Sequence, residues 1–446
     1  MPTDLQKQTI QYIIYIMKRT ALLLLATCLA AAVFAQFSKP RREYVDFLVT
    51  ANHPDRIYSA GDDAVITVEA YKGGLPLDGV MLHFSAGEEM MPPTLKDSLP
   101  FRNGKAHIAA GTLAQPGFKE CSLRFTVYGK TYKETVKLAF SPDSIKPYTV
   151  MPADFDKFWK KTLKACAATP LDSEVTPLPA YSTDTVEVSL VKLTVGAAGR
   201  HVYGYLTRPR DGKVHPVLFC PPGAGASRIS PTTYYSERGF IYFNINIHND
   251  CNPEADDAAY ERAKAAVEGY NRRGIAAKET FYYREVYAAC SRCIDFLCSL
   301  PDWDGINVGV TGGSQGGALS IVTAALNPKV TFCSPFYPAL CDLTGFRNHR
   351  AGGWPKYYEK TEEEPGADVT MQYYDVVNFA RVLKCPVFYS FGYNDPTCSP
   401  TSTYAAYNVI TAPKTLRVTP TSGHWRFPET NDESVEWMQN MAGIKR

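Results

Sequence analysis

Ser314 carries the clearest signature of chemistry in this chain, because it stands in a Gly-x-Ser-x-Gly pattern with Gly312 and Gly316. A strand-like run at residues 306–310 precedes the pattern, and a helical pattern over about 316–326 follows it. A serine on such a tight strand-to-helix turn presents its hydroxyl at the carboxyl edge of a sheet, near the partial positive charge of a helix N-terminus. We therefore predict that Ser314 is the nucleophile of an acyl-transfer reaction.

A serine hydroxyl is a weak nucleophile and needs a general base, usually a histidine that a carboxylate orients. Two histidines follow Ser314 in the chain, His349 and His424. His349 lies in a polar stretch without strand character, whereas His424 follows a strand-like run at 414–418 and a turn at 421–423. In folds with this serine motif the base stands on a loop after a late strand. His424 is therefore the predicted base, and His349 is the alternative.

The orienting carboxylate should lie between nucleophile and base, at the end of a strand. Residues 386–392 have the pattern of a buried strand, and Asp395 follows them almost directly. Other aspartates in this interval lie in helical or loop contexts, namely Asp342, Asp368 and Asp375. Asp395 is therefore the predicted acid of a Ser–Asp–His triad.

The oxyanion of an acyl-transfer intermediate needs two N–H donors. One is expected from Gln315, the residue after the nucleophile, and the other from the loop after the third strand of the sheet. That loop is the Pro/Gly-rich stretch at 221–226, in which Gly223 allows close approach of the backbone and Ala224 is the predicted donor. The mechanism that these residues imply requires no metal and no organic cofactor.

These residues need a rigid scaffold to hold them together. The pattern of hydrophobic residues changes near residue 147, which predicts two domains. From 147 to 446, strand-like runs alternate with helical patterns, which predicts an α/β-hydrolase fold with a mostly parallel central sheet. Between 40 and 146 the pattern is period-two and interrupted by turn signals. It predicts a small all-β, immunoglobulin-like sandwich domain. The clearest strand-like runs in this part are 64–70, 80–84 and 123–127.

The sequence around the predicted triad resembles that of the acetyl xylan esterase and cephalosporin-C deacetylase family. The similar segments are the nucleophile motif at 310–319, the acid loop at 392–400 with residues 405–408, the run 282–287 and the entry segment 152–159. The resemblance covers the chain from about Pro152 to its end. It implies removal of acetyl groups from small acetyl esters, with acetylated xylo-oligosaccharides as the usual substrates.

The chain departs from that family's pattern at three places. The family often has a tyrosine in the oxyanion loop, where Ala224 stands here. Its usual Arg-Gly-Gln motif is absent from the matching stretch at 244–249. The residue after the base is Trp425 instead of the common glutamate. The predicted triad is intact at all three of its positions.

Composition narrows the choice of partners. A formal charge of +2 over 446 residues gives no reason to expect nucleic acid or an anionic membrane as a partner. Cys290 and Cys293 form a C-x-x-C pair without a second pair or a histidine at zinc-finger spacing, so we expect no metal site. We interpret both as small buried hydrophobes of a helix. The sequence does not determine disulfide pairing or the oligomeric state.

Two other functions are compatible with the same residues. A prolyl-oligopeptidase-like peptidase shares the fold and the triad. It would need an anchor for a peptide amino terminus, and the acidic run at 362–364 is better explained as a solvated face. A glycan-binding surface protein with an inert hydrolase domain would have no use for an intact triad. The residues therefore favour a serine esterase whose partner is an acetylated oligosaccharide or another small acetyl ester.

The first residues of the chain have the pattern of a secretory signal peptide, with a charged start, an apolar run and a small-residue exit. Lys18 and Arg19 precede an apolar run that begins at Ala21 and ends at Phe34 and Ala35. The run is shorter than the ~20 residues that a membrane-spanning helix needs. Met17 stands directly before the charged pair and is an alternative start of translation. We expect residues 1–35 to be removed and the protein to be exported, to the periplasm or the medium, without remaining attached to a membrane.

This expectation is tested on protein purified from its native host. Because signal peptidase cleaves after a small-residue exit, mass spectrometry of the mature protein should find an N-terminus near Gln36. An intact Met1 in that material contradicts the prediction.

Overall fold

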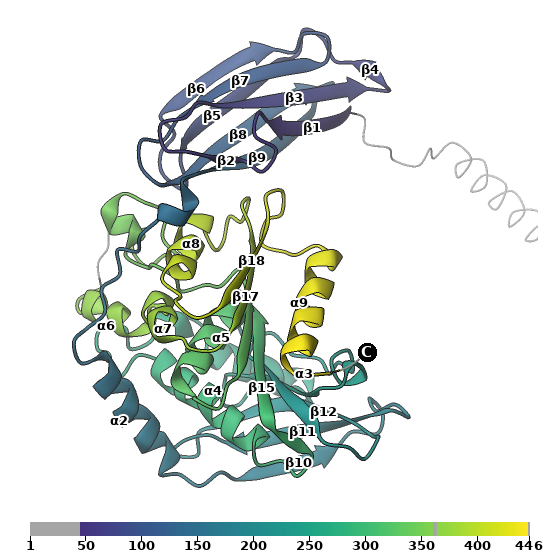
Figure 1. Cartoon of the computed structure of the whole chain (residues 1–446), viewed down its shortest axis with the longest axis vertical. Helices are drawn as coiled ribbons and strands as arrows, with labels where there is room; N and C mark the ends of the chain where they lie inside the picture. The colour runs from purple at the N-terminus through teal and green to yellow at the C-terminus, as the bar shows by residue number, and fades with distance from the viewer. Residues whose placement is uncertain (1–44, 360–363, 445–446) are drawn as a thin grey trace, which may run out of the picture.

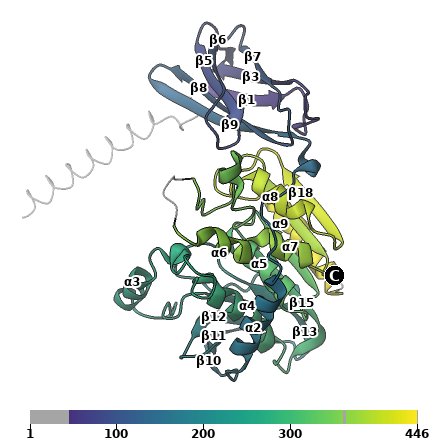
Figure 2. The same cartoon turned by 90° about the vertical axis from the view of Figure 1, so that its left-hand side faces the viewer.

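A computed structural model describes residues 45–359 and 364–444 (Figure 1). The predicted signal peptide at 1–35 lies outside these residues. The described chain has a smaller part built of strands and a larger part built of strands and helices (Figures 1 and 2). No helix within the described ranges is both long enough and apolar enough to cross a membrane.

The N-terminal part consists of two sheets that share one apolar core. One sheet has the order β1-β3-β4 with β7 paired to β3, and the other has the order β2-β9-β8-β5-β6. All pairs are antiparallel except β2 with β9. The strands are β1 (Val45–Ala51), β2 (Ile57–Tyr58), β3 (Ala64–Lys72), β4 (Leu75–Pro76), β5 (Met81–Glu88), β6 (Leu95–Pro100), β7 (Lys105–Gly111), β8 (Gly117–Val127) and β9 (Lys130–Phe140). The three strand-like runs named from the sequence fall in β3, β5 and β8.

The larger part is organised around a nine-stranded sheet with the order β10-β11-β12-β14-β13-β15-β16-β17-β18. The six strands from β14 to β18 run parallel, while β10, β11 and β12 pair antiparallel at one edge. The strands are β10 (Ser173–Pro177), β11 (Val186–Thr194), β12 (His201–Pro209), β13 (His215–Cys220), β14 (Ile241–Asn246), β15 (Trp303–Gly313), β16 (Phe332–Phe336), β17 (Val387–Gly392) and β18 (Lys414–Thr419). The mostly parallel sheet predicted from the sequence is therefore present.

Helices cover both faces of this sheet (Figure 1). α4, α5 and α7 contribute to the large apolar core on one face, and α9 packs on the other face against side chains of β13, β14 and β16. α4 is buried at twelve of its fifteen positions because it lies between the sheet and α2. The helices are α2 (Phe155–Ala167), α3 (Asp257–Ala266), α4 (Tyr283–Leu297), α5 (Gln315–Leu326), α6 (Ala367–Tyr374), α7 (Val376–Val382), α8 (Pro400–Asn408) and α9 (Pro428–Met441). Single 3-10 turns are η1 (Pro142–Ser144), η2 (Ser236–Arg238), η3 (Tyr270–Arg272) and η4 (Gly345–Asn348).

The cysteines of the described chain are all without disulfide bonds. Cys290 and Cys293 are fully buried in α4, where they belong to the apolar core. Burial raises the pKa of both thiols, so they stay protonated and behave as small apolar side chains.

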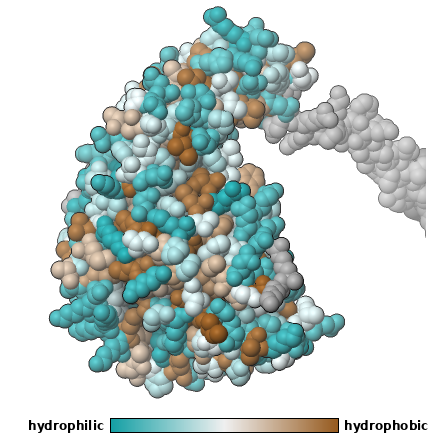
Figure 3. Space-filling view, viewed as in Figure 1, coloured by the Kyte–Doolittle hydropathy of each residue, from teal (hydrophilic) through white to brown (hydrophobic). Residues whose placement is uncertain are grey.

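The two parts of the molecule are in direct contact. Both cartoon views place the N-terminal strands next to α8 and the carboxyl end of β18. On the face shown in Figure 3, hydrophobic residues are interspersed among hydrophilic ones over both parts, and the surface is hollowed between them on one side. The N-terminal strands therefore lie beside the loops that follow β17 and β18.

Candidate active site

Ser314 occupies a strained turn between β15 and α5. β15 ends at Gly313 and α5 begins at Gln315, so Ser314 alone links strand to helix. Its backbone has φ 58° and ψ −124°, a region that residues with a side chain rarely adopt and that costs about 1–3 kcal/mol. Such a conformation presents a serine hydroxyl at the edge of the sheet.

The glycines of the motif let strand, turn and helix approach one another. A Cβ atom on Gly312 would lie 2.8 Å from the backbone of Gly316, and one on Gly316 would lie 2.5 Å from the carbonyl oxygen of Pro221. Both distances are too short for a real side chain. The Gly-x-Ser-x-Gly spacing thus brings the N-terminus of α5 against β15 and against the loop after β13.

His424 and Asp395 form a hydrogen-bonded pair on the loops after β18 and β17. Nδ1 of His424 lies 2.7 Å from Oδ2 of Asp395. The Asp395 side chain is fully buried, and its Oδ1 accepts hydrogen bonds from the amides of Thr397 at 2.8 Å and Cys398 at 2.9 Å. Because the carboxylate accepts, Nδ1 of His424 carries the proton and Nε2 keeps its lone pair. This is the tautomer that a general base for a serine requires.

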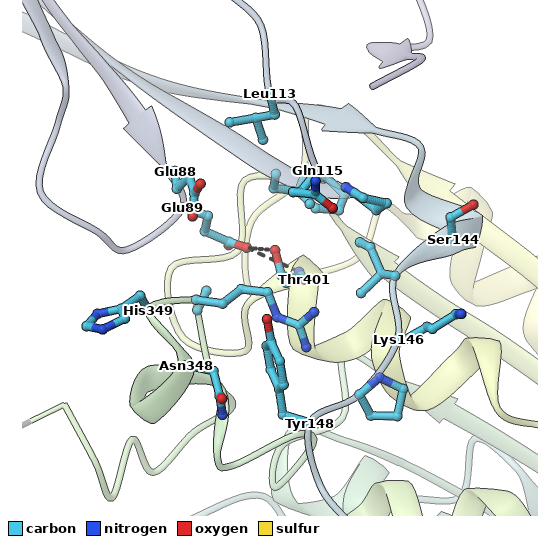
Figure 4. A pocket seen from close by; sticks show the side chains of 17 residues that line it. Glu88, Glu89, Leu113, Gln115, Ser144, Lys146, Tyr148, Asn348, His349 and Thr401 are labelled. Carbon is cyan, nitrogen blue, oxygen red and sulfur yellow. Dashed lines mark hydrogen bonds between the residues drawn. The ribbon is translucent and has the colours of Figure 1, made fainter. Parts of the chain in front are cut away.

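Ser314 and His424 line the same cavity, which has a volume of about 350 Å³. Gly313 and Phe336 also line it, so it opens at the carboxyl ends of β15 and β16. His349, the alternative base, is exposed and lines a different cavity, between η4 and the N-terminal strands (Figure 4). The structure therefore brings the three predicted triad residues to one site and leaves His349 outside it.

The fully buried side chain of Gln315 ties the start of α5 to the loop after β13. Its Oε1 accepts hydrogen bonds from the hydroxyls of Tyr270 and Tyr283, each at 2.6 Å. Its Nε2 donates to the carbonyl oxygen of Gly223 at 3.0 Å. The two parts of the predicted oxyanion hole are thus joined by a side chain whose backbone amide is itself one of the predicted donors.

Two adjacent amides, those of Gly223 and Ala224, are available as the second oxyanion donor. Neither the Gly223 amide nor the Ala224 amide donates a hydrogen bond to another residue in the described ranges. Gly223 lines the cavity with Ser314, whereas Ala224 is exposed next to it. Ala224 therefore stays a prediction, and the neighbouring Gly223 amide is its alternative.

The sequence analysis did not identify the aromatic side chains that contact His424 and Gln315. The ring of Tyr337 lies against His424, with ring centroids 4.4 Å apart. Tyr270 and Tyr283 fix Gln315, as described above. The position of Tyr337 one residue after β16, at the same sheet edge as Ser314, is the signal that identifies it.

Within the part of the chain that the structure describes, one group of side chains has donor atoms close enough for a metal ion. It consists of Asp395, Cys398 and His424, whose ligand atoms lie within 4.8 Å of one another. Burial raises the pKa of the Cys398 thiol well above its usual value, and a hydrogen bond with the Ser314 side chain opposes that shift. A protonated thiol is a poor metal ligand. Both oxygens of Asp395 already accept hydrogen bonds, so the geometry fits a hydrogen-bonded triad better than a metal centre.

A comparison with protein-family models finds a match to the family described as acetyl xylan esterase (AXE1), over residues 140–441. Among curated proteins, the acetyl esterase Axe7A of Xylanibacter ruminicola is 41% identical over 420 residues, which cover 92% of this chain and 94% of that protein. A match of this extent includes most of the N-terminal strands as well as the larger part of the chain.

Solved structures of acetyl xylan esterases match about two thirds of this chain. The acetyl xylan esterase of Paenibacillus sp. R4 is 25% identical with a TM-score of 0.58, and the match covers 67% of this chain and 98% of that one. Acetyl xylan esterase 1 of Thermoanaerobacterium sp. JW/SL YS485 has 22% identity and a TM-score of 0.59, with 67% and 97% covered. The likeness places the larger part in the α/β-hydrolase type of fold that the sequence predicted.

Proposed function

Because this chain belongs to the acetyl xylan esterase family and is a carboxylic ester hydrolase, we propose that it removes acetyl groups from acetylated carbohydrates, xylo-oligosaccharides above all. The observation that carries the proposal is that His424, hydrogen-bonded to the buried Asp395, lines the same cavity as Ser314 at the sheet edge. Family membership and this geometry favour an esterase over a peptidase of the same fold or an inert glycan-binding protein.

The proposed reaction is a two-step acyl transfer. Oγ of Ser314 attacks the acetyl carbonyl carbon while Nε2 of His424 takes the hydroxyl proton. Asp395 holds the imidazole in place and stabilises its cation. The carbonyl oxygen becomes an oxyanion that the Gln315 amide and the Ala224 or Gly223 amide bind. His424 then gives its proton to the departing sugar oxygen, which leaves an acetyl ester on Ser314. Water, activated by the same histidine, attacks this ester and releases acetate.

Exposed aromatic side chains next to the base support a carbohydrate substrate. Trp425, directly after His424, is 48% exposed, and its ring lies 4.6 Å from that of the partly exposed Phe427. An exposed indole face offers a large apolar surface of the kind on which a sugar ring packs. We propose that Trp425 contacts the sugar that carries the acetyl group.

The remaining sequence expectations belong to the same proposal. The signal-peptide pattern supports action outside the cytoplasm, where polymeric plant glycans are encountered. The paired antiparallel sheets of the N-terminal part support an immunoglobulin-like module that precedes the hydrolase.

Removal of the nucleophile should abolish turnover without unfolding the protein. Ser314→Ala deletes one hydroxyl and is expected to lower kcat for p-nitrophenyl acetate and for acetylated xylo-oligosaccharides by roughly 10⁴- to 10⁶-fold. Acetate release measures the loss, and circular dichroism checks the fold. Comparable turnover by wild type and variant would remove Ser314 from the mechanism.

The two histidines provide a matched pair for testing the base. His424→Ala should abolish esterase activity, because among the described residues that line the Ser314 cavity His424 is the one His, Asp or Glu side chain. His349→Ala should leave kcat and KM for p-nitrophenyl acetate unchanged, because His349 lines another cavity. The opposite result would transfer the role to His349 and leave Asp395 without a base to orient.

Trp425→Ala tests the substrate class. Loss of a packed aromatic face costs about 0.5–1.5 kcal/mol, so KM for an acetylated xylo-oligosaccharide should rise about 2- to 12-fold. KM for p-nitrophenyl acetate, which has no sugar, should stay the same. Tyr181→Ala is the control, because Tyr181 is 45% exposed but lies on the connection between β10 and β11. An equal KM change for both substrates would argue against sugar contact.

A further inference from the structure

The N-terminal part contacts the larger part through one end of β8 and β9, where the burial pattern changes. β9 is exposed at four of its first five positions and buried at all of its last five, Val136 to Phe140. Period-two geometry sends alternate side chains of a strand to opposite faces. Val136, Leu138 and Phe140 belong to the N-terminal core, so Lys137 and Ala139 point to the other face. That face is buried because the larger part covers it.

Apolar residues of this outer face join the core of the larger part. Ala139 and Phe118 of β8 belong to the same apolar cluster as the side chains beneath the nine-stranded sheet. The ring of Phe118 lies 4.9 Å from that of Tyr393 and 5.8 Å from that of Tyr404. Tyr393 stands near the start of the acid loop, two residues before Asp395, and Tyr404 is in α8 at the end of that loop. The N-terminal part is thus packed against both ends of the segment that carries Asp395.

Lys137 is the buried charged residue of β9 on this face, and it is 1% exposed. Glu120, its cross-strand neighbour on β8, is partly exposed and lies 3.7 Å from the Nζ of Lys137. This Nζ donates to the backbone carbonyl oxygen of Asp395 at 2.6 Å and to Oε1 of Glu89 at 2.6 Å. The backbone amide of Lys137 donates to Oδ1 of Asn394 at 3.0 Å. A single buried lysine of the N-terminal part therefore fixes two successive residues of the acid loop.

Glu89 continues the contact to the start of α8. It is also 1% exposed, and its Oε2 accepts hydrogen bonds from the Thr401 hydroxyl at 2.7 Å and the Thr401 amide at 3.1 Å (Figure 4). Burial raises the pKa of the Glu89 carboxyl, while Lys137 and Thr401 act in the opposite direction. Glu89 and Thr401 line one side of a cavity of about 720 Å³ between the two parts.

A second contact reaches the loop that carries the base. Nη1 of Arg56, in the N-terminal part, donates to the carbonyl oxygen of Pro420 at 2.9 Å and lies 3.5 Å from Oδ1 of Asn394. Pro420 stands four residues before His424, on the connection from β18. The N-terminal part therefore contacts the acid loop and the base loop from the same side.

We propose that the N-terminal part is a structural component of the active site, in which the buried Lys137–Glu89 pair positions the acid loop so that Asp395 orients His424. Lys137 and Glu89 are positioning residues, which act on the reaction through Asp395. This inference rests on the proposed function of Asp395 as the acid of the triad.

Positioning by Lys137 can reach His424 because both hydrogen-bond to Asp395, one at its backbone carbonyl oxygen and the other at its carboxylate. Its carbonyl oxygen is held by Lys137 and its carboxylate holds His424, so a shift of the peptide displaces the carboxylate. Displacement of a catalytic group by about 1 Å can cost about 10²-fold in rate. A charge left unpaired in this interior would be costly, so the pair acts as a unit with its loop.

The test variant replaces both charges together, as Lys137→Met with Glu89→Gln. The glutamine keeps an acceptor for Thr401 and leaves no unpaired buried charge, so the protein should fold. The change removes the lysine's hydrogen bonds to Asp395 and residue 89, and its 3.7 Å ion pair with the partly exposed Glu120. We expect kcat for p-nitrophenyl acetate to fall about 10- to 100-fold while KM stays constant. Circular dichroism and thermal unfolding measure the folded fraction.

The same double change in an Asp395→Ala background separates positioning from a general structural role. Where residues act through one another, their effects do not multiply. The triple variant should therefore have a kcat no more than about twofold below that of Asp395→Ala alone. Lys105→Met, which breaks a partly exposed ion pair with Glu69 on β3 and β7, is the control and should keep wild-type kcat.

Two results would overturn the inference: wild-type kcat in the double variant, or a full further loss in the Asp395→Ala background. If the double variant does not fold, Thr401→Val is the substitute, because it removes the hydroxyl that donates to Glu89. It should lower kcat several-fold, and an unchanged kcat would overturn the inference. If Asp395→Ala itself keeps wild-type turnover, the proposed acid has failed and this inference with it. If Asp395→Ala is impaired and the double variant is not, the inference alone fails.

Discussion

A carboxylate buried away from water needs hydrogen-bond donors on both of its oxygens, and the site is arranged around that requirement at Asp395. Two amides of its own loop satisfy Oδ1, and His424 satisfies Oδ2. The residue's carbonyl oxygen accepts from Lys137 of the N-terminal part. The donors come from three elements, so the position of Asp395 depends on the loop after β17, the loop after β18 and the contact with β9 together.

The family comparisons show which of these contacts fall inside the family model and which lie outside it. The family model covers residues 140–441 and therefore leaves β1 to β8, and all of β9 except Phe140, outside it. The match to the Xylanibacter ruminicola acetyl esterase extends over 92% of this chain and so includes most of these strands. Lys137 and Glu89 both stand before residue 140, so their contacts come from a part of the chain outside the family model.

The sequence predicted the elements whose pattern is local and periodic, and the three triad residues that stand at their ends. β15, α5 and β17 agree with the predicted runs to within a few residues, because hydrophobic periodicity and the glycine spacing are properties of neighbouring residues. The antiparallel edge strands β10 to β12 and the tyrosines around Gln315 were not foreseen. Their roles depend on packing between segments distant in sequence. Lys137 is the clearest example of what the sequence could not predict. A lysine at an outward position of a period-two strand is expected to be exposed, but Lys137 is buried by the larger part.

The choice of a charged pair at this junction has a physical consequence that apolar packing lacks. Apolar contacts such as those of Phe118 gain free energy from burial in many orientations, because the hydrophobic effect is non-directional. Lys137 and Glu89 are satisfied only where the Asp395 carbonyl oxygen and the Thr401 donors stand at hydrogen-bond distance. A displaced module would leave buried charges without partners, at a cost of several kcal/mol. The apolar contacts therefore provide the attraction between the two parts. The buried ion pair fixes their relative position to within the tolerance of a hydrogen bond. The His424–Asp395 pair, which is itself a hydrogen bond, requires the same tolerance.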